Sequence, residues 1–127
     1  MITKEAHVRL IINADKKSLA KKIADKIILN ISVDKKSLSK LLRYEDEAHY
    51  DISFTSKLTA STYKQLEHQS FKLCTNIVKG PWLFQNLAEK YDKYNFTFLA
   101  IFNYEAFIKN DPFYNNKLKW ALVEIIN

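Results

Sequence analysis

The sequence predicts a single α+β domain over residues 1–127, a two-layer sandwich with helices on one face of a mostly antiparallel sheet. Two observations carry this prediction. Several short segments alternate apolar and polar residues, which is typical of strands, and between them apolar residues recur at helical spacing. We expect four to five strands, connected with the helices in the split-βαβ, or ferredoxin-like, arrangement.

The first elements are a strand followed by a helix. In residues 7–13, Val8, Leu10 and Ile12 alternate with more polar neighbours, so we expect them to point into the core. Asp15 is a suitable N-cap for the helix that follows, because its carboxylate can accept hydrogen bonds from the first free N–H groups. Paired lysines lie opposite the apolar stripe of this helix.

Residues 27–33 fit two structures. They can extend the helix, but they are rich in β-branched residues and also alternate at a period of two, which favours a second strand. A short internal repeat supports the strand, since Asp-Lys-Lys-Ser-Leu occurs at 15–19 and again at 34–38, each time after an apolar run. The second copy predicts a helix over residues 35–43.

The middle of the chain predicts a strand over residues 49–58 and a helix behind it. Thr62 and Gln65 have the spacing of a capping box, and Gly80 followed by Pro81 predicts the end of that helix. The inward residues of the strand are expected to be Tyr50, Ile52 and Phe54. Proline also suits the first turn of a further helix, for which the expected packing residues are Trp82, Leu87, Ala88 and Tyr91.

Two strands are predicted near the C-terminus. Residues 95–103 form the more central one, with Phe96, Phe98, Ala100 and Phe102 on one face. Residues 117–126 form the last one. Its expected inward residues are Leu118, Trp120 and Leu122.

The positive charge is concentrated in the first third of the chain. The net charge is +6, and residues 1–43 carry eleven Lys or Arg against four Asp or Glu, whereas residues 44–127 carry nine against ten. A phosphate-binding face is one explanation, and an A/T-rich genome is another, since eighteen of the twenty cations are lysine. The candidate phosphate-binding residues are Lys16, Lys17, Lys21, Lys22, Lys35, Lys36 and Lys40.

The predicted open face of the sheet argues against base stacking. Its expected residues are Arg9, Ile11, Ser53, Thr55, Thr97, Leu99, Lys119 and Ala121. None of them is aromatic, whereas an RNA-recognition sheet stacks bases on exposed rings. Nucleic acid is therefore the second hypothesis for the partner.

No motif in the sequence predicts catalysis. Cys74 is the only cysteine and Gly80 the only glycine, which excludes a disulfide within the chain, a P-loop and a Rossmann fingerprint. His7, His49 and His68 do not have the spacing of metal ligands. We predict no catalytic residue, no metal and no cofactor. An enzyme using His7, His49 and Asp51 in a cleft is the third alternative.

Two groups of residues suggest a protein partner instead. The acidic residues are Glu45, Asp46, Glu47 and Asp51, which either form a solvated turn or dock a basic partner. The aromatic residues are Tyr104, Phe107, Phe113 and Tyr114, in a segment that either contacts a partner or covers a sheet edge.

The leading hypothesis is a small non-enzymatic protein-binding module. The general character is that of a bacterial immunity or antitoxin-type protein, whose partner is a toxin domain. No signal peptide or membrane span is visible in the sequence, so we expect a cytoplasmic protein that does not bind membranes.

Overall fold

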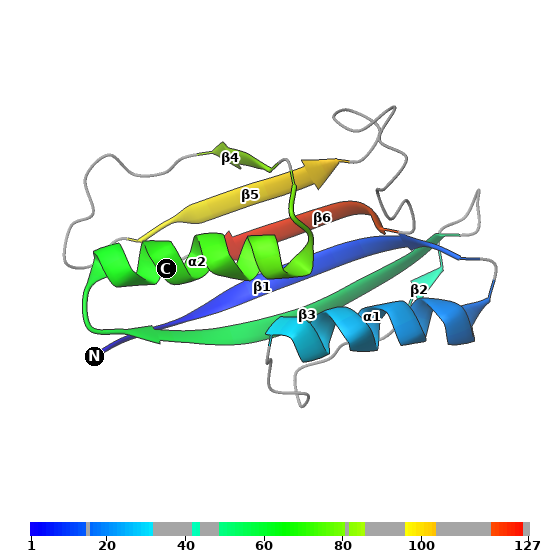
Figure 1. Ribbon diagram of the computed structural model, residues 1–127, viewed down its shortest axis with the longest axis horizontal. Helices are drawn as coiled ribbons and strands as arrows, with labels where there is room; N and C mark the ends of the chain where they lie inside the picture. The colour runs from blue at the N-terminus through cyan, green and yellow to red at the C-terminus, as the bar shows by residue number, and fades with distance from the viewer. Residues whose placement is uncertain are drawn as a thin grey trace.

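The computed structural model has two helices packed on one face of an antiparallel sheet, as the α+β prediction expected (Figure 1). It describes residues 1–14, 16–31, 42–43, 49–80, 82–85, 96–103 and 118–125. Neither helix in these ranges is both long and apolar enough to cross a membrane.

The described part of the sheet has six strands in the order β2-β3-β1-β6-β5-β4, and all neighbours are antiparallel. The strands are β1 (Ile2–Asn13), β2 (Leu42–Arg43), β3 (His49–Ala60), β4 (Leu83–Gln85), β5 (Phe98–Asn103) and β6 (Leu118–Ile125). Strands β1 and β3 pair along their whole length, from Ile2 opposite Ala60 to Asn13 opposite His49. Because β1 also pairs with β6, it joins the two halves of the sheet.

The hydrophobic core lies between the sheet and the helices α1 (Lys17–Ile31) and α2 (Tyr63–Ile77). In β1, β3 and β5 the strand residues that alternation predicted to point inward are buried; in β1 these are Val8, Leu10 and Ile12. Phe96, Phe98, Ala100 and Phe102 are also fully buried. Burying one such large side chain contributes about 1.5–3 kcal/mol, so this layer holds both helices in place.

Helix α1 continues to Ile31, so the strand predicted over residues 27–33 is wrong in its described part. A strand would place Leu29 on the same side as Ile27, but Ile27 is buried and Leu29 is 70% exposed. The helix forms because the apolar residues from 27 onward continue the stripe of the preceding turns. The buried residues of that stripe are Ala20, Ala24, Ile27 and Ile28.

The helix predicted over residues 35–43 is wrong at its end. Leu42 and Arg43 form β2, where they pair with Asp51 and Tyr50. The rest of that segment, residues 35–41, lies outside the described residues, and so does the expected N-cap Asp15.

Helix α2 begins as the capping signal predicted. Thr62 has an extended backbone, and its Oγ1 accepts a hydrogen bond from the N–H of Gln65 at 3.1 Å. The Gln65 side chain returns to the N–H of Ser61 at 3.0 Å, one residue before the usual capping-box position. The buried residues of α2 are Leu66, Ser70, Leu73, Cys74 and Ile77.

The helix predicted after Gly80 is wrong in its described part, where Leu83–Gln85 form a strand. Gly80 has a φ of +113°, which allows the chain to turn, and the indole N–H of Trp82 donates to the Val78 carbonyl at 2.8 Å. Leu83 then pairs with Ile101, which makes β4 an edge strand of the sheet. The other packing residues of the predicted helix, Leu87, Ala88 and Tyr91, lie outside the described residues.

Candidate functional site

The candidate site is the face of the sheet opposite the helices, which no described helix covers (Figure 1). Directly paired residues of antiparallel strands point to the same face, so the register fixes which side chains meet there. Across β3, β1 and β6 the outward residues form three rows, which are Thr55–His7–Glu124, Ser53–Arg9–Leu122 and Asp51–Ile11–Trp120.

A β-bulge in β6 decides which residues reach this open face. Ile11 pairs with Trp120 but Ile12 pairs with Leu118, so Lys119 is an extra residue. The predicted inward set of β6 is therefore wrong beyond Leu118. Ala121, Val123 and Ile125 are buried, and Trp120, Leu122 and Glu124 lie on the open face. The open face thus has an aromatic ring, contrary to the prediction, and Ala121 does not belong to it.

Arg9 lies in the middle strand of the open face, where Asp51 of β3 and Trp120 of β6 both contact its guanidinium group. Its Nε donates to the two carboxylate oxygens of Asp51 at 3.0 and 2.8 Å, and its Nη2 forms an ion pair with the same carboxylate. Its guanidinium carbon also lies 5.7 Å from the centre of the Trp120 ring. A guanidinium held by a carboxylate and an aromatic ring loses little further freedom when a partner binds.

An apolar strip continues from Arg9 toward the β4 edge. We define it as Ile11, Leu83, Leu99, Ile101, Trp120 and Leu122. Leu83 is 48% exposed, and the other five are partly exposed. Apolar side chains adjacent in space, on a face that neither described helix covers, mark an interaction surface more clearly than isolated ones.

A shallow hollow of about 400 Å³ lies beside this strip, over β3, β1 and β6. Its outward lining residues are His7, Arg9, Ser53, Thr55, Leu122 and Glu124. The outward lining combines the apolar side chain of Leu122 with hydroxyl, imidazole and charged groups. Such a hollow can receive a single side chain from another protein.

The structure separates the two histidines of the enzyme alternative. His7 pairs with Thr55, whereas His49 pairs with Asn13, six positions farther along the same two strands. At the rise of a β-strand these positions are about 20 Å apart. Asp51 binds Arg9 rather than a histidine. Within the described ranges, no three His, Cys, Asp or Glu residues come close enough to hold a metal ion.

Most of the predicted partner-binding residues lie outside the described residues. These are Glu45, Asp46, Glu47, Tyr104, Phe107, Phe113 and Tyr114. Asp51 is described, and it lies on the open face in its ion pair with Arg9. Of the predicted phosphate-binding residues, Lys35, Lys36 and Lys40 also lie outside. The exposed ones are Lys16, Lys17, Lys21 and Lys22.

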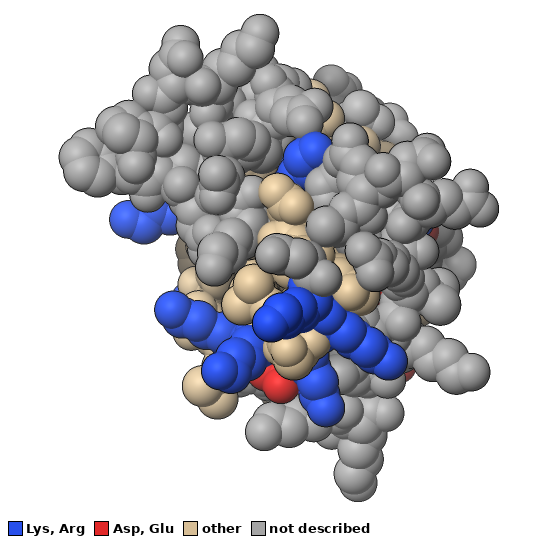
Figure 2. Space-filling model, turned by 90° about the vertical axis from the view of Figure 1, so that its right-hand side faces the viewer, with Lys and Arg blue, Asp and Glu red and all other residues tan. Residues whose placement is uncertain are grey.

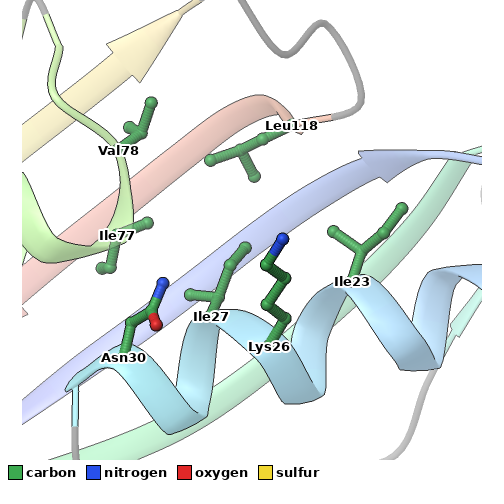
Figure 3. Close-up of a pocket in the computed structure, with 7 residues that line it drawn as sticks. All are labelled: Ile23, Lys26, Ile27, Asn30, Ile77, Val78 and Leu118. Atoms are coloured by element: carbon green, nitrogen blue, oxygen red, sulfur yellow. The ribbon is translucent and has the colours of Figure 1, made fainter.

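A second hollow, of about 420 Å³, lies on the other side of the sheet, between α1 and the end of α2 (Figure 3). Ile23 and Ile27 line it from α1, Ile77 and Val78 from the end of α2, and Leu118 from β6. Lys26 and Asn30 supply its polar groups. Among the described lining residues, five are aliphatic and none is an acid, a histidine or a thiol.

Cys74, the only thiol, is fully buried in α2. Its burial raises the pKa of the thiol to about 12, although a backbone hydrogen bond opposes this shift. A nucleophilic cysteine needs a lowered pKa and access to a substrate. Cys74 therefore acts as a small core residue.

These features define a small α+β protein with an antiparallel sheet that has one open, partly apolar face. No family model matches the chain, and neither does any curated protein or solved structure.

Proposed function

We propose that this chain is a non-enzymatic protein-binding module that docks a folded protein partner on the open face of its sheet. The observation that carries the proposal is the apolar strip next to the Arg9–Asp51 pair. Tryptophan and arginine are the side chains most enriched at the energetic centres of protein interfaces. Here Arg9 and Trp120 are neighbours already in contact.

The charges of the open face favour a protein over a polyanion. At the positions of β1, β3 and β6 that the pairing places on this face, the charged residues are Glu5, Arg9, Asp51, Lys57 and Glu124, whose charges nearly cancel. Charges of both signs around an apolar centre are typical of a protein interface with a polar rim. A nucleic-acid surface requires an excess of cations, which the described outward residues of this face do not supply.

The hollow beside the strip gives the proposed docking surface a way to select its partner. A partner side chain that enters it can contact Leu122 and at the same time reach the Ser53 and Thr55 hydroxyls and the Glu124 carboxylate. A small apolar or basic side chain at the centre of the partner surface suits this lining. Such a contact, surrounded by the rest of the strip, is the usual form of an interface anchor.

We further propose that the partner is a bacterial toxin domain, which the chain neutralises in the cytoplasm as an immunity or antitoxin-type protein. The separation of charge along the chain supports this, because it allows electrostatically steered association with a charged partner. The test is to express the captured partner alone and together with this chain. Growth inhibition that co-expression relieves is expected, and a harmless partner would contradict the toxin hypothesis.

We also infer that the fold is an enlarged split-βαβ, or ferredoxin-like, arrangement. The support is the order β2-β3-β1-β6, in which β3 lies between the strands before and after α1, and β1 lies between β3 and β6. Two interleaved units of this kind place both helices on one face. Strands β4 and β5 extend the sheet beyond β6, which widens the open face.

The docking surface is tested by a matched pair of leucine substitutions. Leu83→Asp places a charge on the open face, and Leu29→Asp places one on α1, where Leu29 is even more exposed. Wild-type and Leu29→Asp chains are expected to retain the same stoichiometric partner from nuclease-treated lysate, and Leu83→Asp to lose it. Equal retention by both variants, or loss in both, excludes the open face as the docking surface. Sedimentation of the purified chain shows whether that partner is a second copy.

A further inference from the structure

We propose that the exposed lysines at the start of α1 form a second binding surface, which contacts the phosphate backbone of nucleic acid independently of sequence. The surface consists of Lys16, Lys17, Lys21 and Lys22, and we call it the α1 lysine surface. All four side chains are exposed, and no hydrogen bond or ion pair joins them to another described residue. Figure 2 shows lysine side chains gathered where α1 begins, with little acidic surface among them.

Two features at the start of α1 are electrostatically unfavourable for the helix, although the exposed Asp25 lies within one turn of Lys21 and Lys22. Lys17 and Lys21 are four residues apart on a helix, where like charges repel. The first turn of α1 contains no acidic residue to balance the positive end of the helix dipole. A bound anion would reduce both the repulsion between the lysines and the unbalanced helix dipole. Residues that lower the stability of their own helix in this way are typical of functional surfaces.

The burial pattern of α1 favours nucleic acid over a membrane. An amphipathic helix binds a membrane by inserting its apolar face, but that face of α1 packs on the sheet. An acidic protein partner is also disfavoured, because lysine is depleted at the centre of protein interfaces. What remains exposed is a set of flexible point charges, which suits the regularly spaced phosphates of a duplex.

This surface is separate from the proposed protein-docking surface. Helix α1 lies on one side of the sheet, and the apolar strip lies on the other (Figure 1). The α1 lysines account for four of the positive charges of a chain whose net charge is +6, whereas the outward charges of β1, β3 and β6 nearly cancel. Either proposal can therefore fail without affecting the other.

The experiment compares two variants of equal net charge. One replaces the four α1 lysines by glutamine. The control makes the same change at four exposed lysines elsewhere, which are Lys57, Lys64, Lys72 and Lys79. Both variants reduce the net charge from +6 to +2. Binding of each full-length chain to a fluorescent duplex of arbitrary sequence is measured by anisotropy across a salt series.

Four phosphate contacts predict a slope of about −3.6 for log K against log salt, which weakens wild-type binding about 150-fold between roughly 50 and 200 mM salt. We expect the α1 variant to lose most of this affinity and slope, and the control variant to keep both. Equal losses in the two variants, or no duplex binding by the wild type at low salt, overturn the proposal. Binding to anionic lipid vesicles without binding to the duplex overturns it in favour of a membrane surface.

Discussion

The stability of this protein should depend on pH through Cys74. Burial raises the pKa of this thiol from 9.0 to about 12 in the folded state. Because the folded-state pKa lies above the unfolded one, the stabilisation is fully present below pH 9 and is lost as the pH rises toward 12. At pH 10 the unfolded thiol is mostly ionised while the folded thiol is not, which lowers the free energy of unfolding by about 1.4 kcal/mol relative to neutral pH.

Cys74→Ala isolates this contribution. The variant creates a small cavity and is less stable than the wild type at neutral pH, but it removes the titrating thiol and leaves every lysine and tyrosine in place. Urea unfolding under reducing conditions gives the free energy of each protein at several pH values. The advantage of the wild type should shrink by about 1.4 kcal/mol between roughly pH 7.5 and 10. An advantage independent of pH would show that the folded thiol is not desolvated.

A chemical probe tests the same reasoning kinetically. With a pKa near 12 the thiolate fraction of folded Cys74 at pH 8 is about a thousandfold below that of a thiol with a pKa of 9.0, before steric protection is counted. Modification by a disulfide reagent should therefore follow unfolding of the chain. Rapid labelling of the native protein, at the rate seen in denaturant, refutes the burial of this side chain.

Three further predictions concern the described contacts. Thr62→Ala should lower the free energy of unfolding by about 1 kcal/mol, and Thr62→Ser by less, because only the alanine loses the oxygen that caps α2; urea titration measures both. Gly80→Ala should cost more than about 1 kcal/mol in the same assay, because its φ is +113° and an added Cβ would lie 3.0 Å from Trp82 atoms. A double-mutant cycle between Arg9 and Asp51 should give a coupling of about 0.5–1 kcal/mol that Arg9→Lys largely removes, since lysine cannot form the bidentate contact. A coupling of zero would contradict the prediction that this pair stabilises the fold.

Sequence patterns correctly predicted the elements in which the local conformational preference of the residues agrees with the side chains that the fold buries. The alternation of β1, β3 and β5 placed Val8, Ile52 and Phe98 in the core, where the structure has them. The cap at Thr62 predicted the start of α2 because its hydrogen bonds are local. For residues 27–31 both periodicities were present, and packing against the sheet decided in favour of the helix.

The candidate site was less predictable, because it depends on pairing between distant segments. Nothing in the local sequence marks Lys119 as a bulge, yet this one residue determines that Trp120 lies on the open face. The contact between Arg9 and Asp51 joins residues 42 positions apart, and only the register of β1 and β3 brings them together. The edge strand β4 was missed because Pro81 favours a helix start, while the pairing partner of Leu83 lies in β5.

The bulge has a physical cause in the core that it borders. The residue of β6 opposite both Leu10 and Phe102 is Ala121, and its small side chain lies in a layer that already contains Trp82, 5.7 Å from Phe102. Without the bulge, an indole would occupy this layer, and overpacking at that density is destabilising. The extra residue therefore places the small Ala121 side chain, rather than the Trp120 indole, in this core layer. The placement of Trp120 beside Arg9 follows from it, so the packing of the inner layer determines the surface offered to a partner.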